Sequence, residues 1–161
     1  MRQGFWEFSL AFYARPGVSA ACIALQDEHA ADVDLILYGL WAASEGHCLS
    51  PGDIAAADRL AGPWRETVLD PIRRARRAMK PPPDGFDAAM VDALRRQVLA
   101  AELEAERVQH DALARHFAPG DAASDPVAAA RGNLMRYAAH VGIPESAAPL
   151  ATLLDACAGS S

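Results

Sequence analysis

The chain has 161 residues, of which 52% are hydrophobic and 22% are charged, and its net charge is −6 at pH 7. This length fits one domain with one core, and this composition excludes an intrinsically disordered chain. Because the overall charge is acidic, binding to nucleic acid or to an anionic membrane would require a local basic patch.

Helical periodicity runs through every long segment, and no segment shows sustained alternation of β-branched residues. We therefore predict an all-α fold, a compact bundle of seven or eight helices in a single domain over residues 1–161. A first helix over 4–14 carries aromatic residues on more than one side. Pro16 then takes the first position of a second helix, whose core stripe is Val18, Ala21, Cys22 and Leu25.

The third helix is nearly all apolar, so we place it at the centre of the fold. Asp32 is its expected N-cap, because a carboxylate there accepts from the free backbone N–H groups, and Gly46 ends it. Residues 50–53, Ser-Pro-Gly-Asp, predict the capped start of a short helix that stops at residues 62–63, Gly-Pro.

The next predicted helix starts at Trp64, and Pro71 is expected to kink or break it. Three prolines, Pro81 to Pro83, end it and mark a possible sub-boundary within the domain. A long helix then follows near 86–117. Its predicted packing seam consists of Val91, Leu94, Val98, Ala101, Ala105, Val108 and Ala112.

Residues 118–125 are predicted to form a loop, after which Asp125-Pro126 begins another helix, and a last helix contains Leu150 and Leu153. The three cysteines are widely spaced and lack a Cys-x-x-Cys pair, which argues against disulfides and zinc and favours a reducing cytoplasm. The apolar start lacks the features of a signal peptide. The longest apolar run, 35–43, is about half of what spans a bilayer, so we expect no membrane contact.

Three N-terminal motifs carry a family resemblance: Phe-Trp-x-Phe-Ser-Leu from Phe5, Tyr-Ala-x-Pro-Gly-Val from Tyr13, and Leu-Gln-Asp from Leu25. With them, the chain resembles an uncharacterised family of short, mainly proteobacterial proteins, a domain of unknown function. The resemblance continues through Trp64 and residues 71–73 to the Glu-rich part of the long helix. It implies no reaction.

A cluster of polar residues lies on the long helix, where Glu102, Glu106, Gln109 and His110 share an arc with leucines. One interpretation is a metal or acid/base site completed by Asp27, His29 or Asp32. The favoured alternative is a partly solvated flank with salt bridges, because the Glu-x-x-His spacing of di-iron bundles is absent.

A basic run covers residues 65–80, which contain six basic residues and only two acidic ones, Glu66 and Asp70. The net charge of this segment is +4, so the rest of the chain has a net charge of −10. Clustered arginines suit phosphate contacts, but no interleaved aromatics or nucleic-acid motif accompany them. We favour the alternative, in which these arginines pair with carboxylates on neighbouring helices and fix helix register.

No nucleophile elbow, phosphate-binding loop or dinucleotide fingerprint is present, which disfavours an enzyme, and we expect no cofactor and no metal. The leading hypothesis is a cytoplasmic protein-binding or regulatory module whose partner is another protein, and it predicts exposed apolar residues. The alternatives are an enzyme or ligand binder built on the carboxylate and histidine cluster, and a nucleic-acid binder. The candidate functional or network residues are Gln26, Asp27, Asp32, Trp41, Trp64, Arg65, Arg73, Arg76, Arg77, Glu102, Glu106 and His110.

Overall fold

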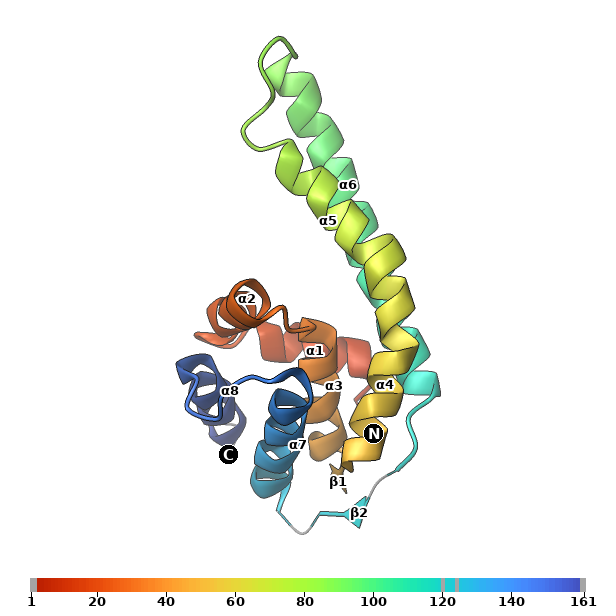
Figure 1. The fold of residues 1–161 in the computed structure, drawn as a ribbon, viewed down its shortest axis with the longest axis vertical. Coiled ribbons are helices and arrows are strands. Elements are labelled where there is room, and N and C mark those ends of the chain that lie inside the picture. The colour runs from red at the N-terminus through yellow and green to blue at the C-terminus, as the bar shows by residue number, and fades with distance from the viewer. Residues whose placement is uncertain (1–2, 120, 124, 160–161) are drawn as a thin grey trace.

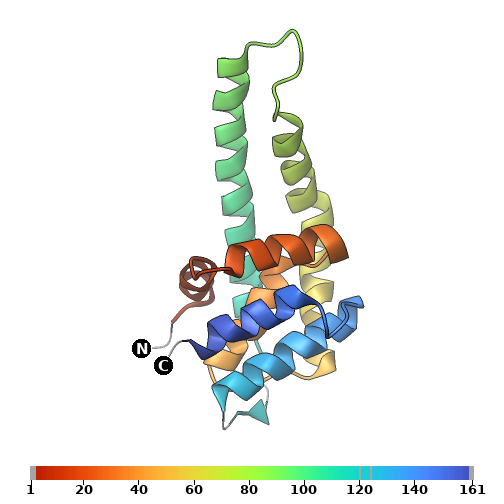
Figure 2. The ribbon, with the colours of Figure 1, turned by 90° about the vertical axis from the view of Figure 1, so that its left-hand side faces the viewer.

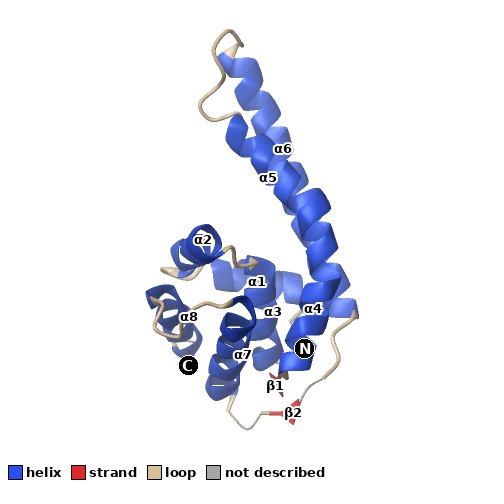
Figure 3. Ribbon diagram, in the orientation of Figure 1, coloured by secondary structure: helices blue, strands red, loops and turns tan. Residues whose placement is uncertain are grey.

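Helices account for nearly all regular structure in the computed structural model, which describes residues 3–119, 121–123 and 125–159. Within these ranges, eight α-helices and one short π-helical segment (η1) are formed (Figures 1 and 3). Because α4, η1 and α5 are continuous, the prediction of an all-α fold with seven or eight helices is confirmed. The elements are α1 (Phe5–Tyr13), α2 (Val18–His29), α3 (Val33–Ser44), β1 (His47–Cys48), α4 (Pro51–Trp64), η1 (Arg65–Leu69), α5 (Asp70–Ala78), α6 (Ala88–Arg115), β2 (Asp121–Ala122), α7 (Pro126–Val141) and α8 (Ala148–Ala158).

The body of the molecule is built around α3, in which every residue from Asp34 to Ala43 is buried. α1, α2 and α7 pack on it, and α8 packs on α2 and α7. α3 and α7 approach closely at Gly39, where an added Cβ would lie only 3.6 Å from Cβ of Asn133. The Asn133 amide fixes this contact, since Nδ2 donates to the carbonyl of Gly39 at 2.9 Å and Oδ1 accepts from the N–H of Leu49 at 2.7 Å.

Several helix starts follow the sequence rules. Oδ1 of Asp32 accepts from the N–H of Asp34 at 2.9 Å and caps α3 as predicted, and Ser50 opens α4 with a reciprocal capping box. The second helix starts later than predicted. Gly17, with φ of 79°, is its N-cap, so Pro16 precedes the helix; glycine adopts this left-handed conformation without steric cost.

The predicted end of a helix at residues 62–63 is wrong. α4 contains Pro63 and runs on through η1 into α5, forming one long rod. Pro71 lies in the first turn of α5, directly after the π turn. In a π turn the N–H of residue i+5 bonds to the carbonyl of residue i, as Asp70 does to Arg65. This wider turn accommodates Pro71, which has no N–H to donate. A local change of pitch therefore replaces the expected break at Pro71.

The upper part of the rod pairs with α6, and the two helices project from the other elements as a hairpin (Figures 1 and 2). We call residues 70–104 the arm and the other described residues the body. Pro81 to Pro83 lie in the loop at the tip of the arm, between α5 and α6. The long predicted helix is confirmed as α6, which starts at Ala88 after the N-cap Asp87.

The packing seam predicted for α6 is wrong in part. Leu94 and Val108 are each 51% exposed and Ala101 is also exposed, whereas Ala105 is buried. The other three seam residues, Val91, Val98 and Ala112, are partly buried. The face that α6 buries consists of Glu102, Ala105, Gln109, His110 and Leu113. The burial face is therefore rotated toward polar residues, which the apolar periodicity could not indicate.

Two short strands close the lower end of the body, where β1 pairs antiparallel with β2 and His47 lies opposite Ala122. This pairing lies partly in the segment predicted as a loop. Among the described residues, no single helix is both long and apolar enough to cross a bilayer, and the pair α1–α2, which would be long enough together, is bent by 99°.

Candidate functional site

Ionic contacts gather where the arm joins the body. Buried Asp32 accepts a hydrogen bond at Oδ2 from Nη1 of Arg65 at 2.6 Å. Nη2 of Arg65 donates to Asp58 at 3.1 Å, and Nε2 of His140 lies 2.9 Å from the other Asp58 oxygen. Burial opposes the charge on Arg65, but the hydrogen bonds that it donates to Asp32 and Asp58 raise its pKa. Arg65 thus stays charged and ties the rod to α3.

A second ionic cluster holds α5 against α6. Buried Glu102 accepts from Nε of Arg73 at 3.3 Å and from two nitrogens of Arg76. Nη2 of Arg73 donates to Glu106 at 2.8 Å. Burial raises the pKa of Glu106, although the hydrogen bond and the charge of Arg73 act against this rise. Because Arg73 and Arg76 neutralise carboxylates on α6, they are not available as a phosphate-binding surface.

Asp34 has a different environment from these carboxylates. It is buried, Oδ2 accepts from Nε2 of Gln109 at 3.0 Å, and Oδ1 lies 3.8 Å from Nδ1 of His110. Within the described ranges no arginine forms an ion pair with it. Burial raises the pKa of Asp34 well above its usual range, and the charges of Asp32 and Glu106 raise it further. The protonated form of Asp34 is therefore favoured.

His110 links α6 to α1. Nδ1 lies 2.9 Å from the carbonyl oxygen of Glu106, and Nε2 lies 3.0 Å from Oγ of Ser9. The ring of Phe5 stacks on the imidazole with a centroid distance of 4.2 Å. Burial lowers the pKa of His110, so the neutral imidazole is favoured, although its contact with the Glu106 carbonyl opposes this shift.

A half-open cavity of about 280 Å³ lies beside these groups, between α1, α2, α3 and the base of the arm. Its polar lining consists of Ser9, Gln26, Asp34, Arg73, Glu106 and His110. Its apolar lining consists of Trp6, Leu10, Ala14, Val33 and Leu37, together with the ring of Tyr13. An apolar pocket with a few convergent polar groups is the usual form of a small-molecule site.

The carboxylates that were candidates for metal binding do not converge on one ion. Asp32 pairs with Arg65, while Glu102 and Glu106 pair with arginines of α5. Over residues 3–119, 121–123 and 125–159, no group of three or more His, Cys, Asp or Glu side chains is placed to hold a metal ion. Asp32, Glu102 and Glu106 each form the ion pairs with arginines that the alternative interpretation, a network of salt bridges, predicts.

The other candidate residues have separate positions. Trp41 is a core residue whose Nε1 donates to the carbonyl of Gln3 at 3.1 Å, and Trp64 joins the rod to α6 by donating to the carbonyl of Ala105 at 3.0 Å. Asp27 and Arg77 are both exposed, and Nη2 of Arg77 lies 3.8 Å from Oδ1 of Asp27. Gln26 is the only one of this group that lines the cavity beside His110.

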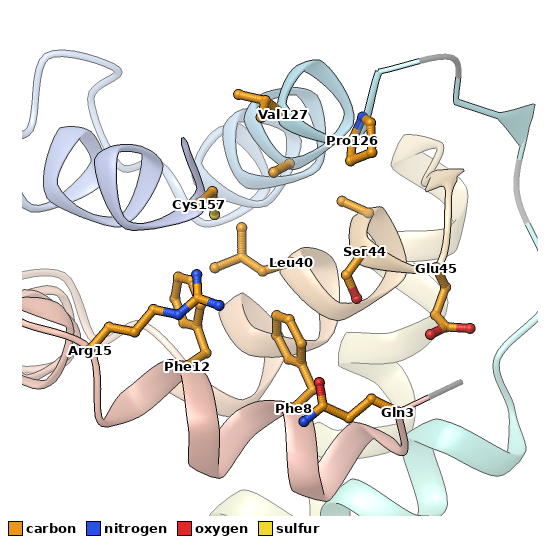
Figure 4. Close-up of a pocket in the computed structure, with 12 residues that line it drawn as sticks. Gln3, Phe8, Phe12, Arg15, Leu40, Ser44, Glu45, Pro126, Val127 and Cys157 are labelled. Carbon is orange, nitrogen blue, oxygen red and sulfur yellow. The ribbon is translucent and has the colours of Figure 1, made fainter. Parts of the chain in front are cut away.

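A larger cavity of about 530 Å³ lies on another side of the body, between α1, α3 and α7. Figure 4 shows Phe8 and Phe12 extending from α1 toward Leu40, with Cys157 nearby. Burial raises the pKa of Cys157 to about 11, against the opposing charge of Arg15, so the thiol is not activated. No histidine is among the described residues that line this cavity.

The arm carries a set of exposed apolar residues. Met90 is 74% exposed, Leu94 is 51% exposed and Phe86, just before α6, is 70% exposed. Because Met90 and Leu94 are four residues apart, they share one face of α6. Leu99 and Leu103 are likewise spaced by four and are exposed on another face.

Sequence reasoning missed Ser9, and it gave Asp34 no functional role. Ser9 lies between Phe5 and Phe12 on the buried face of α1, where a hydroxyl needs a partner. Asp34 lies inside the apolar helix α3, where a second carboxylate close to Asp32 is unusual. Both positions were visible as polar residues on apolar faces, but their partners on α6 were not.

Comparison with known proteins gives a family and no activity. Residues 4–113 match a family model described as "Protein of unknown function (DUF2390)". No curated protein matches the chain, and no solved structure matches it.

Proposed function

The chain belongs to the DUF2390 family of proteins of unknown function, and from this premise we propose that it is a protein-binding module whose arm docks on another protein. The observation that carries this proposal is the exposure of Phe86, Met90 and Leu94 at the outer part of the arm. Monomeric proteins seldom leave neighbouring large apolar side chains exposed without a binding role.

Charge on the arm defines the chemistry of the partner. Arg74 and Lys80 are exposed on or just after α5, and Arg77 is exposed beside Asp27. The other two arginines of α5 are engaged by Glu102 and Glu106. The exposed cations make this surface complementary to an acidic segment. We therefore propose an amphipathic helix with an apolar stripe and acidic flanks as the partner, which would pack beside α6 as helices pack in a bundle.

The proposed location is the cytoplasm. Cys22, Cys48 and Cys157 are free in the structure, which is compatible with a reducing compartment. There the protein would act by binding its partner, and the arm would catalyse no reaction.

A photo-crosslinking side chain placed at Met90 in the producing cells tests this function. We expect one dominant crosslinked protein, whose attached peptide is acidic and amphipathic, and we expect its yield to fall at high salt. The same crosslinker at Ala128, an exposed position on α7, is the matched control and should give no such product.

Leu94→Glu in the Met90 crosslinking variant provides the decisive comparison. Because Leu94 is half exposed, the substitution should preserve the helical circular dichroism spectrum while reducing the crosslinked product at least tenfold. Equal product from Met90 and Ala128, crosslinking to a second copy of the chain, or insensitivity to Leu94→Glu would each overturn the proposal.

A further inference from the structure

The cavity beside His110 contains a pair of groups that the protein-binding function does not use. Oγ of Ser9 and Nε2 of His110 are 3.0 Å apart, and both residues line the cavity. We propose that this cavity is a catalytic site for small apolar acyl esters, in which Ser9 is the nucleophile and His110 is its general base. This proposal is independent of the arm and its partner.

Backbone geometry sets the tautomer of His110. Nδ1 lies 2.9 Å from the carbonyl oxygen of Glu106, which can only accept a hydrogen bond, so Nδ1 carries the proton. Nε2 is then the unprotonated nitrogen and accepts from the hydroxyl of Ser9. This is the arrangement that a histidine needs to remove a proton from a serine hydroxyl.

Two further groups line the cavity beside the pair. Oδ1 of Asp34 lies 3.8 Å from Nδ1 of His110, beyond hydrogen-bond distance, and its protonated form is favoured, so the Glu106 carbonyl and not Asp34 orients the imidazole. Arg73 also lines the cavity, but its guanidinium is held by Glu102 and Glu106. The proposal therefore rests on the Ser9–His110 pair itself.

The apolar lining indicates the substrate class. Trp6, Leu10 and Leu37 line the cavity together with the polar groups, and its volume of about 280 Å³ is just below the range usual for ligand pockets. Leu10, which contributes to this lining from α1, is 56% exposed. A short aliphatic or benzoyl ester suits this lining better than a charged or polymeric substrate.

The reaction has two balanced steps. Oγ of Ser9 bonds to the ester carbonyl carbon while its proton passes to Nε2 of His110; the alcohol then leaves with that proton, and the acyl group remains on Ser9. Water next attacks the acyl-serine while His110 takes its proton and returns one to Oγ of Ser9. The products are a carboxylic acid and an alcohol, and no other reactant is needed.

A fluorophosphonate probe tests this site directly, since it forms a covalent bond with an activated serine and with few other groups. We expect labelling of the full chain at Ser9, located by peptide mass spectrometry, together with hydrolysis of p-nitrophenyl butyrate. Ser9→Ala should abolish both signals. The matched control is Ser44→Ala, which removes an exposed hydroxyl bonded to the carbonyl of Trp41 and should leave both signals unchanged.

His110→Gln should lower the labelling rate at Ser9 at least about a hundredfold, as expected for loss of a general base. Thermal unfolding of each variant shows whether it folds. Asp34→Asn is a second control that retains the shape of the site. Its labelling rate at Ser9 should stay close to that of the wild type, because an amide resembles the protonated carboxyl of Asp34 and the Glu106 carbonyl still orients His110.

The pH dependence separates catalysis from packing. The labelling rate of the wild type should fall as His110 becomes protonated below its lowered pKa, in the field of Asp34 and Asp32 on α3, Glu106 on α6 and Arg73 on α5. Labelling in His110→Gln should lack this titration. Absence of probe at Ser9 in the folded wild type, or equal labelling of the His110→Gln variant, would overturn the proposal.

Discussion

In the body, Leu35, Ile36 and Leu40 of α3 and Leu134 of α7 are at most 2% exposed, whereas on the arm Met90 and Leu94 are more than half exposed. The arm is also held differently, because its two helices meet through buried Glu102 and the arginines of α5. Apolar burial therefore stabilises the body and ionic contacts position the arm. Apolar side chains on the arm are left available for a partner, which is the property that a docking element requires.

The largest expected effect contrasts one leucine from each region. Leu134→Ala in the body should lower the free energy of unfolding by about 3 kcal/mol, because Leu134 is 1% exposed and its removal leaves a cavity. Leu94→Ala on the arm should change it by less than about 0.5 kcal/mol. Urea denaturation followed by circular dichroism measures both values. Similar losses for the two variants would contradict the division between body and arm.

A smaller effect is expected from Glu102→Gln, which removes the charge that Arg73 and Arg76 share. The cost should be about 2 kcal/mol, since hydrogen bonds to charged groups contribute about 1.5–3 kcal/mol and two partly buried arginines lose their counter-charge. Native-state hydrogen exchange in α5 should report this loss more fully than global unfolding, because local openings need less free energy than global unfolding.

Asp111→Asn is the control for Glu102→Gln. Asp111 lies 3.0 Å from Arg115 one turn along α6, and both side chains are more than half exposed. Exposed pairs of this kind contribute about 0.5 kcal/mol or less, so exchange in α5 should stay unchanged. An equal effect of the two substitutions would show that burial of Glu102 does not set its contribution.

Local signals predicted much of the fold. Asp32 and Ser50 were identified as N-caps because capping depends on residues within one turn, and both cap in the structure. Continuation through Pro63 was missed, because it depends on the packing of the rod against α6 and on the π turn that follows it. Tertiary contacts thus overrode a local stop signal.

The site was predictable only in part. Basic residues of α5 and acidic residues of α6 could be assigned to one ionic network from their charge, and the structure forms those pairs. The contact of Ser9 with His110 joins residues 101 apart in the chain, and no periodicity links them. The exposed side chains Met90 and Leu94 look like core residues in sequence, because apolar spacing does not distinguish a covered face from an open one.

The smallest expected effect concerns Asp34, near the place where the arm joins the body. Asp34→Asn should stabilise the protein by an amount that depends on pH. The raised pKa of Asp34 means that the folded state retains a proton which the unfolded chain releases. Stability from this group is fully present below the unfolded pKa and is lost as pH rises through the folded pKa. An amide resembles the protonated carboxyl at every pH, so the gap in unfolding free energy between variant and wild type should be near zero in acid and should widen as pH rises. Thermal unfolding from pH 3 to pH 9 measures the gap, because the loss begins at the unfolded pKa of 3.8, with Asp111→Asn as the exposed control. A gap that is constant with pH would mean that the pKa of Asp34 is the same in the folded and unfolded states, and the junction would then hold an unneutralised buried charge at neutral pH.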